Sequence, residues 1–477
     1  MRLPESFKPA RLAAALVVSG IGATNALAYP AVVTNGDNDG EGSLRAALAS
    51  GATEIVVTTN QDIMITDTLV YSDTRALAIY GSGQKIVAHD DFTLLEVSEG
   101  ASLKVVGLDF KGPGGFSIQN QSDDPGNAGK GIFIDVRDDQ TGNVRLEMVD
   151  VTVRGVANHG VHVSDCDLAD DCGGGGGGAG GGSPASIRVI FNNVVIKDVG
   201  NGKFDADGLR VDERNSGNIT FNAYDFKARD VGADGVELDE GQDGTVRANV
   251  YSSSFNENGN YCDPELLQPQ LDAFLGGAPD EDEFDESEEV TEDDLPGPVT
   301  GTLDDRCFEY EVDLYDSDFV EAYEYGIDVD DGFDIDEAGK GSLVAVLVDS
   351  RIEENLDEGV DFDEEDQGRI DLIAIRSKAE ENADDGFKLS EEGSAGVEVV
   401  AHKVRSTDNG GKGLVFEEAD NGSLTALVSR STTENNDDSD DTGIEAVQED
   451  NGSGTLTVRN SSIADGIDAE GVTVIEE

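Results

Sequence analysis

Residues 359–375 read Gly-Val-Asp-Phe-Asp-Glu-Glu-Asp-Gln-Gly-Arg-Ile-Asp-Leu-Ile-Ala-Ile, and this stretch decides the fold. Apolar and polar residues alternate in 359–363 and again in 369–375, with the period of a strand that buries one face. The five residues between them, 364–368, have the composition of a turn. The stretch therefore predicts two short strands joined by a turn, and helical spacing is largely absent from the rest of the chain.

The same pattern returns at a nearly constant interval. The repeat glycines are Gly208, Gly235, Gly332, Gly359, Gly386, Gly413, Gly443 and Gly471. From Gly332 onward their spacings are 27, 27, 27, 30 and 28 residues, and Gly208 lies 27 residues before Gly235. Strand pairs in units of ~27 residues favour a parallel β-helix with one coil per unit, because propeller blades need ~40–50 residues and a leucine-rich consensus is missing.

Stacked coils place equivalent residues directly above one another, on strands ~4.8 Å apart. Four asparagines share the 27-residue interval, at Asn355, Asn382, Asn409 and Asn436. Amide side chains stacked in this way can bond to their copies above and below and to the turning backbone. We therefore predict an internal asparagine ladder at a turn; the alternative is that four turn asparagines coincide.

The segment 42–48, Gly-Ser-Leu-Arg-Ala-Ala-Leu, is followed by Ala-Thr-Glu-Ile-Val-Val at 52–57. This opening resembles that of many secreted bacterial right-handed parallel β-helix proteins of the pectin-lyase-like superfamily. The resemblance implies a short helix that caps the first coil, which would otherwise expose an unpaired edge. We predict an all-β chain, a right-handed parallel β-helix (solenoid) with a short N-terminal capping helix. This scaffold hosts lyases, hydrolases, epimerases and adhesins, so the resemblance implies no single activity.

The first 28 residues have the organisation of an export signal. Three basic residues precede an apolar run, 12–23, and Ala26-Leu27-Ala28 fits a cleavage site. We predict a signal peptide over 1–28 and one β-helix domain over 29–477, secreted or held at the surface of a bacterium, with the periplasm as a further location. The apolar run is too short to cross a bilayer, so we expect no transmembrane segment after cleavage.

Two insertions interrupt the repeat, at 166–184 and 262–307. The first contains runs of glycine and reads as a flexible loop, whereas 280–294 has eleven acids in fifteen residues and is expected to be disordered. Four cysteines allow three pairings. Because export implies an oxidising compartment, we favour the disulfides Cys166–Cys172 and Cys262–Cys307, each of which brackets one insertion. Reduced, buried thiols are the alternative.

The charge balance excludes some partners. The chain has 477 residues, with 32 Lys and Arg against 101 Asp and Glu, and its net charge is −69. Binding to nucleic acid needs basic side chains that displace counterions, and anionic membranes also attract basic segments. We therefore expect neither partner. An extracellular polysaccharide or a cell-surface component is the partner that we predict.

Acids recur at two positions of the repeat, one residue before the glycine and five residues after it. These positions give the predicted metal ligands Asp207, Glu213, Asp234, Glu240, Asp331, Glu337, Glu358, Glu364, Asp385 and Glu391. Like charges on neighbouring strands destabilise a sheet. Calcium takes 6–8 oxygen ligands and is the cofactor that we predict on these columns. The alternative is a salt-adapted surface whose acids are only solvated and screened.

Catalytic residues are not singled out by the sequence. Arg210 and Arg214 lie among acids between the two insertions, and the resemblance implies that a polysaccharide lyase would use such a base, often with calcium. Paired carboxylates could instead hydrolyse glycosides, but pairs occur throughout the chain. His159 and His162 are three residues apart, so we expect them on opposite faces of a strand, which argues against a zinc site.

These observations together predict an exported acidic β-helix protein. Its predicted role is that of a calcium-binding extracellular or surface module, which binds a partner or is structural in the manner of an adhesin. The alternative is a secreted polysaccharide lyase or glycoside hydrolase with its site within 207–240.

Overall fold

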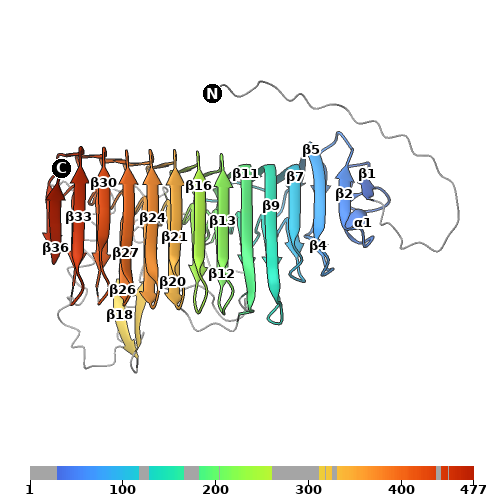
Figure 1. Ribbon diagram of the computed structural model, residues 1–477. Helices are drawn as coiled ribbons and strands as arrows, with labels where there is room; N and C mark the ends of the chain where they lie inside the picture. Colours follow the sequence, from blue (N-terminus) through green and yellow to red (C-terminus); the bar gives the residue numbers. More distant parts are fainter. Residues whose placement is uncertain are drawn as a thin grey trace, which may run out of the picture.

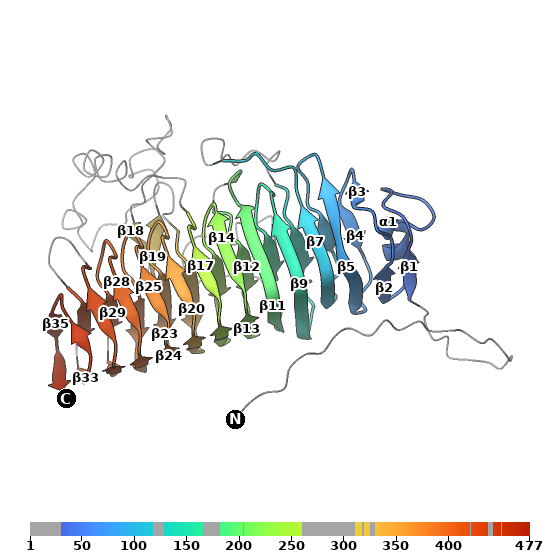
Figure 2. The same cartoon turned by 90° about the horizontal axis from the view of Figure 1, so that it is seen from above.

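Alternating apolar residues make short strands in each repeat unit, and the strands of successive units pair in parallel to form a right-handed β-helix. The computed structural model describes residues 30–117, 128–165, 182–203, 205–259, 311–316, 319–324, 330–419, 421–436, 442–449 and 451–477. The coils stack in chain order along one axis, as Figure 1 shows from the side and Figure 2 from above. The predicted fold class is confirmed. The predicted signal peptide, 1–28, lies outside the described residues, as do all four cysteines.

One sheet receives a single strand from each coil. Its twelve strands are β4 (Leu69–Tyr71), β6 (Leu95–Val97), β8 (Ile132–Asp135), β10 (Val161–Ser164), β12 (Leu209–Glu213), β15 (Val236–Glu240), β20 (Phe333–Gly339), β23 (Val360–Asp366), β26 (Lys388–Gly393), β29 (Leu414–Glu418), β32 (Ile444–Gln448) and β35 (Ile467–Glu470). We call it the short-strand sheet.

The second sheet has 22 strands and forms the remaining sides of the coils. They are β1 (Ala31–Val33), β2 (Glu54–Val57), β3 (Ile63–Ile65), β5 (Leu77–Ala88), β7 (Leu103–Lys111), β9 (Gly142–Arg154), β11 (Ala185–Val199), β13 (Ile219–Tyr224), β14 (Lys227–Val231), β16 (Val246–Tyr251), β17 (Ser254–Asn256), β21 (Leu343–Val348), β22 (Arg351–Glu353), β24 (Arg369–Ile375), β25 (Lys378–Glu380), β27 (Gly396–His402), β28 (Arg405–Thr407), β30 (Thr425–Ser429), β31 (Thr432–Glu434), β33 (Gly454–Arg459), β34 (Ser462–Ile463) and β36 (Val472–Glu476). We call it the long sheet.

A corner residue with left-handed backbone divides the long sheet into two sides. Its φ is 50° at Asp225, 53° at Ser252, 55° at Asp349 and 58° at Lys403. Asp and Asn adopt this conformation with least strain, because their short polar side chains can bond locally. The lysine shows that the paired coils above and below hold the corner in place even where the residue type is unfavourable.

The register repeats from coil to coil. Phe333 pairs with Val360, and Glu337 pairs with Glu364, which in turn pairs with Glu391. Side chains that alternate with the outward positions fill the interior, where the rings of Phe255 and Phe333 stack with centroids 5.2 Å apart. A residue's position in the repeat therefore decides which neighbours it meets, as the predicted stacking requires.

The predicted asparagine ladder is present and extends one step further than predicted. The Nδ2 atom of Asn355 donates to Oδ1 of Asn382 at 2.8 Å, Asn382 donates to Asn409 at 2.9 Å, and Asn409 donates to Asn436 at 2.8 Å. Asn258 donates to Asn355 at 2.9 Å, although 97 residues separate them. The ladder therefore continues across the second insertion, which hides its first member from a search for 27-residue spacing.

The first coil is capped as the sequence indicates. Helix α1 (Leu44–Leu48) begins after Ser43, whose Oγ accepts a hydrogen bond from the backbone N–H of Ala46 at 3.2 Å. The guanidinium of Arg45 donates to the backbone oxygen of Thr68 and to Oδ1 of Asp67, each at 2.7 Å. Leu44 and Leu48 are buried against the first strands. The arginine therefore attaches the cap to the second coil.

Strands β15 and β20 pair directly, although the second insertion separates them in the chain. In the sequence, an antiparallel hairpin of β18 (Glu311–Asp316) and β19 (Phe319–Glu324) comes between β15 and β20. The segments 166–181 and 260–310 are outside the described residues, and the predicted loop and disordered stretch fall there. In the part of the chain that the structure describes, no helix is long and apolar enough to cross a membrane.

Candidate functional site

Charged side chains occupy the outward positions of the short-strand sheet. Arg210 and Asp212 alternate with core residues on β12, and Glu237 and Asp239 hold the equivalent positions on β15. These side chains face away from the core, yet Arg210 is only 5% exposed and Asp212 is fully buried. Burying a charge costs free energy unless it is paired, so their partners decide what this face can do.

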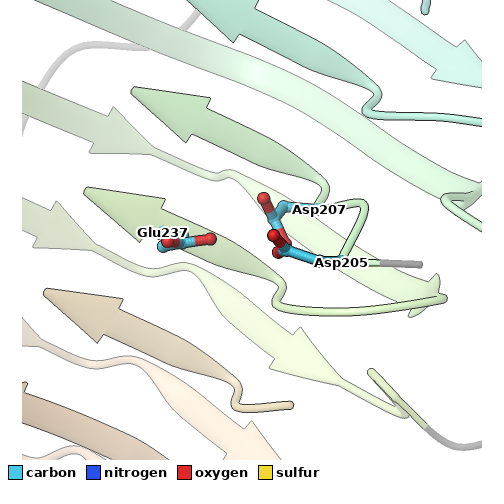
Figure 3. A group of neighbouring side chains, drawn as sticks. All are labelled: Asp205, Asp207 and Glu237. Carbon is cyan, nitrogen blue, oxygen red and sulfur yellow. The ribbon is translucent and has the colours of Figure 1, made fainter. Parts of the chain in front are cut away.

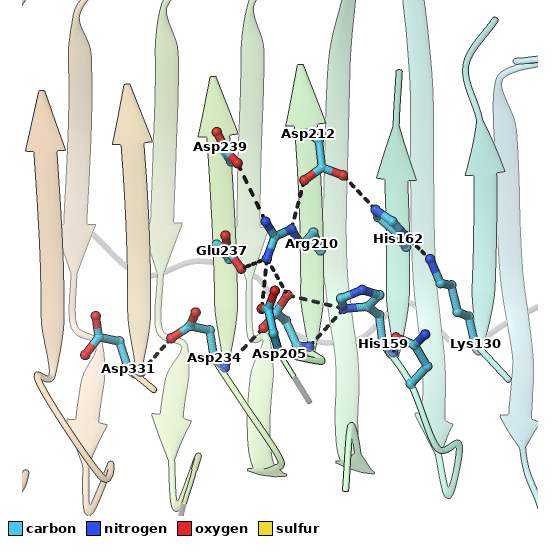
Figure 4. Close-up of polar contacts among 12 residues, drawn as sticks. Lys130, His159, His162, Asp205, Arg210, Asp212, Asp234, Glu237, Asp239 and Asp331 are labelled. Atoms are coloured by element: carbon cyan, nitrogen blue, oxygen red, sulfur yellow. Dashed lines mark hydrogen bonds and ion pairs between the residues drawn. The ribbon is translucent and has the colours of Figure 1, made fainter. Parts of the chain in front are cut away.

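Arg210 is the centre of the polar contacts drawn in Figure 4. Its Nε donates to Oδ1 of Asp212 at 2.8 Å, and its Nη1 donates to Oδ1 of Asp205 at 3.1 Å and to the carboxylate of Glu237. Burial alone would raise the pKa of Asp212, but Arg210 and His162 hold it well below its usual range. Asp212 is therefore a fixed anion between two basic groups.

A chain of hydrogen bonds leads from Asp212 to a lysine. Nε2 of His162 lies 2.7 Å from Oδ2 of Asp212, and Nδ1 of His162 is bonded to Nζ of Lys130. Lys130 Nζ also lies 4.7 Å from the ring centroid of Phe133. Burial lowers the pKa of Lys130 to about 8 and that of His162 to about 4. A neutral imidazole and a lysine that loses its proton near neutrality are the groups that proton transfer requires.

The expectation that His159 and His162 lie on opposite faces is wrong. Their ring centroids are 4.6 Å apart. His159 precedes β10 and lies in the turn that ends at Gly160, so strand alternation does not reach it. Its Nδ1 accepts a hydrogen bond from the backbone N–H of Asp207 at 2.9 Å. His159 therefore links two coils through the turn. Of the two histidines, His162 is the one in the hydrogen-bonded series from Lys130 to Asp212.

The carboxylates of Asp205, Asp207 and Glu237 converge, as Figure 3 shows. One ligand oxygen from each lies within 4.8 Å of the others. Nη1 of Arg210 reaches all three, at 3.1 Å from Asp205, at 3.6 Å from Asp207 and in contact with Glu237. This group therefore already has a cation, which is the guanidinium of the chain itself.

Further along the same face, three neighbouring strands carry acids at their first two outward positions and at the turn before each strand. We call this set the carboxylate grid; it consists of Asp234, Glu237, Asp239, Asp331, Asp334, Asp336, Glu358, Asp361 and Asp363. Two triplets within it bring their oxygens within 4.8 Å of one another, Glu237–Asp334–Asp336 and Asp331–Glu358–Asp361. The grid is therefore a continuous array of potential oxygen ligands.

Arginines pair with the grid at one end, and a lysine pairs with it at the other. Arg210 and Arg214 contact β15, where Arg214 pairs with Asp239. Nζ of Lys388, on β26, donates to Oδ2 of Asp361 at 2.8 Å and lies 3.3 Å from Glu358.

Several oxygens of the grid are buried without a hydrogen-bond donor. They include Oδ1 of Asp239, Asp331 and Asp361, whose residues are 3%, 9% and 8% exposed. Burial raises the pKa of Asp361 to about 6, and burial together with neighbouring acids raises that of Asp334 well above its usual range. Buried oxygens without a donor are the feature that a bound hard cation would satisfy.

The five predicted ligands that precede the glycines stack at one turn, as expected. They are Asp207, Asp234, Asp331, Glu358 and Asp385, and each is at most 9% exposed. Oδ1 of Asp207 accepts from the backbone N–H of Asp234 at 3.2 Å, and Oδ1 of Asp234 accepts from that of Asp331 at 2.5 Å. One oxygen of Asp207 and one of Asp234 therefore tie their coils to the next coil.

The five predicted ligands that follow the glycines are arranged differently. Glu213, Glu240, Glu337, Glu364 and Glu391 stack in a column, but none is more than 1% exposed. Oε1 of Glu240 accepts from the backbone N–H of Gly244 at 2.8 Å, and a Cβ on Gly368 would lie 2.1 Å from Oε1 of Glu364. Each glutamate holds an inward position of its strand, two residues after a core residue, and its carboxylate reaches the turn four residues further along the chain.

The buried glutamates belong to none of the convergent triplets among the described residues. Burial raises the pKa of Glu213 to about 8 and that of Glu240 and Glu364 to about 10. The reading of this column as a solvated face does not fit the structure. The column also has buried oxygens without a donor, on Glu213 and Glu364, but its carboxylates do not converge in threes, so the grid is the better place for a cation.

Six grid residues were missed as ligands from the sequence: Glu237, Asp239, Asp334, Asp336, Asp361 and Asp363. The sequence did contain a signal for them, because the acids at the third and fifth positions after Asp234 and Asp331 alternate with core residues. Lys130 and His162 lie before the first regular repeat, which begins at Gly208. Only the structure shows that their side chains meet.

No family model matches the chain, and no curated protein matches it. Solved structures do match. The A-module of a mannuronan C-5 epimerase from Azotobacter vinelandii is 11% identical, with a TM-score of 0.43, over 94% of this chain and 99% of that one. A pectate lyase is 12% identical, with a TM-score of 0.33, over 91% and 78%. A surface adhesin of Streptococcus pneumoniae is 8% identical, with a TM-score of 0.29, over 94% and 93%. We transfer no residue role from these proteins.

Proposed function

We propose that the protein is an exported extracellular or surface module that binds calcium on the carboxylate grid and thereby presents a rigid face to a polysaccharide or another cell-surface partner. The observation that carries the proposal is the grid itself: nine carboxylates on three paired strands and the turns before them, with two triplets whose oxygens converge within 4.8 Å.

Electrostatics explains why the grid suits a cation. Two unit charges on neighbouring strands, ~4.8 Å apart, repel by about 3 kcal/mol at an effective dielectric constant of 20. Carboxylates are the oxygen ligands that calcium takes, six to eight at a time, and one ion can be shared between strands. Asp331, Glu358 and Asp361 supply such a set, with a buried oxygen of Asp331 and another of Asp361 still without a donor.

Calcium is expected to raise the melting temperature by about 3–5 °C at a concentration of 100 Kd, because a ligand of the native state adds about 2.7 kcal/mol per site there. The measurement is calorimetric or spectroscopic melting of the mature chain in calcium, in magnesium and in sodium chloride of matched ionic strength. Binding to the grid should also release protons, which isothermal titration in two buffers detects.

The variant Asp334→Asn/Asp361→Asn is expected to lose most of this calcium response. Its matched control is Glu398→Gln/Glu434→Gln, which removes the same charge from exposed positions of the long sheet. The proposal is wrong if calcium and sodium raise the melting temperature equally, or if the grid variant keeps the full response to calcium. The acids would then form only a salt-adapted surface.

A second function has one specific observation in its favour. Lys130, His162, Asp212 and Arg210 form a continuous polar chain on a face that is otherwise acidic. In a polysaccharide lyase, a base removes the proton from the carbon beside the sugar's carboxylate. The electron pair forms a carbon–carbon double bond as the bond to the neighbouring sugar's oxygen breaks, and that oxygen takes up a proton. Lys130, half-buried and next to neutral His162, is the base that this reading assigns.

If this second function holds, the mature chain is expected to cleave an acidic polysaccharide and to increase the ultraviolet absorbance of unsaturated chain ends. Lys130→Met should lower that rate by about 10²–10⁴-fold, which is the usual contribution of a positioned base. Lys340→Met, at an exposed lysine paired with Asp243 on a distant coil, should leave the rate unchanged. Absence of activity against carboxylated polysaccharides, with and without calcium, removes this second function and does not affect the first.

A further inference from the structure

Four basic residues stack in register on the long sheet. Lys111 of β7 pairs with Arg154 of β9, which pairs with Lys197 of β11, which pairs with Arg229 of β14. These strands follow one another along the axis in Figures 1 and 2. We call this column the basic strip. It is unexpected in a chain with 32 basic and 101 acidic residues, because like charges directly opposite one another destabilise a sheet.

Three of the four cations of the strip form no ion pair with a described residue, although Arg154 and Lys197 interact electrostatically with Asp198. Lys111, Arg154 and Lys197 form no ion pair with any described residue, whereas Arg229 lies 2.9 Å from Asp230 and 3.9 Å from Glu257. The adjacent outward column consists of Asp109, Thr152, Val195 and Lys227, and the carboxylate of Asp109 accepts the backbone N–H of Thr152. All four strip side chains are partly exposed, so solvent and ligands reach them.

The carboxyl-terminal half of the same sheet provides a comparison. There the basic column Arg351, Lys378 and Arg405 is accompanied by an acidic column on the same strands. Lys378 lies 2.6 Å from Glu380, and Arg405 also pairs with Glu380. Where the fold stacks cations in that half, it places acids beside them. The basic strip also has acids beside it, at Asp198 and Asp230, but among the described residues its ion pairs form at Arg229 alone. Lys111, Arg154 and Lys197 can therefore bind an external anion.

We propose that the basic strip binds a linear acidic polysaccharide that lies along the axis of the β-helix. The four cations span three intervals of ~4.8 Å, so a chain with regularly spaced carboxylate or sulfate groups can contact all of them at once. Single-stranded nucleic acids are held by aromatic stacking as well as by charge, and neither the strip nor its neighbouring column contains an aromatic residue. The strip is independent of the carboxylate grid and of the calcium proposal.

The test is binding of the full mature chain to two probes, polygalacturonate and dextran sulfate, in the presence of a chelator. The chelator removes calcium, so that bridging at the grid contributes nothing. The variant Arg154→Gln/Lys197→Gln is expected to bind at least about tenfold more weakly and to show a salt dependence of log K whose slope falls by about one or more, because fewer counterions are released. Its melting temperature should be unchanged or slightly higher, since stacked like charges have been removed.

The matched control is Arg351→Gln/Lys403→Gln, which removes two exposed basic residues without ion partners from the other half of the sheet. It should bind both probes as the natural chain does. The proposal is overturned if neither probe binds, if the strip variant and the control weaken equally, or if single-stranded DNA or vesicles with anionic lipid bind more tightly than the polysaccharides.

Discussion

Replacing Arg210 by methionine is expected to lower the free energy of unfolding by about 3–5 kcal/mol, which is the usual cost of removing one partner from a buried ion pair. The guanidinium contacts Asp212, Asp205 and Glu237, and Asp212 is fully buried. Methionine keeps most of the side-chain volume and leaves these carboxylates uncompensated. The measurement is equilibrium unfolding in urea at neutral pH, with the circular dichroism of the strands as the signal.

The control for this prediction is Arg351→Met, at an exposed arginine on β22 without an ion partner among the described residues, which should change the stability by no more than about 0.5 kcal/mol. If the loss at Arg210 is below about 1 kcal/mol, solvation by water, and not the arginine, stabilises the charged carboxylates around it. In that case the face is more open than its burial indicates.

Replacing Asn382 by alanine is the second large effect. Its Oδ1 accepts from both Nδ2 and the backbone N–H of Asn355, at 2.8 and 3.2 Å, and its Nδ2 donates to Asn409 at 2.9 Å. Alanine leaves these groups buried without partners, at about 1–3 kcal/mol each. We expect a loss of about 3–5 kcal/mol in the free energy of unfolding, measured by the same urea titration.

Asn451→Ala serves as the comparison for the ladder. The Nδ2 atom of Asn451 also donates to an asparagine one coil away, Asn421, but at 3.4 Å and on an exposed turn. Its removal should cost no more than about 0.5 kcal/mol. Equal losses at Asn382 and Asn451 would contradict the view that burial, and not stacking alone, makes the ladder strong.

The fold could be predicted from the sequence because one physical period governs it. Alternation along 359–375 gives two strands, the 27-residue interval stacks them, and Ser43 with Arg45 marks the cap. Each of these signals is local or strictly periodic. The ladder member Asn258 escaped prediction for the same reason, because an insertion breaks the interval before Asn355 while the coils continue to stack.

The site was predicted only in part, because alternation specifies which way a side chain points and not what surrounds it. Glu364 continues the inward series of Val360 and Phe362 on β23, so it is buried although its residue type suggested an outward, ligand-binding position. His159 lies before its strand begins, and alternation therefore gave it the wrong face. The contact of Lys130 with His162 joins two coils across 32 residues, an interval that differs from the 27-residue repeat and therefore could not be predicted from it.

The direct pairing of β15 with β20 has a consequence for how this protein can change. Gly259 and Asp330 lie next to each other, since a Cβ on Gly259 would come within 3.3 Å of the Asp330 carbonyl, although residues 260–329 connect them. The two ends of the insertion are therefore held side by side by the stacked coils, whatever the length or sequence of the segment that joins them. Doubling the length of such a connection costs only about 0.6 kcal/mol in closure entropy. New modules can be grafted or exchanged at this corner while the coils on either side keep their register.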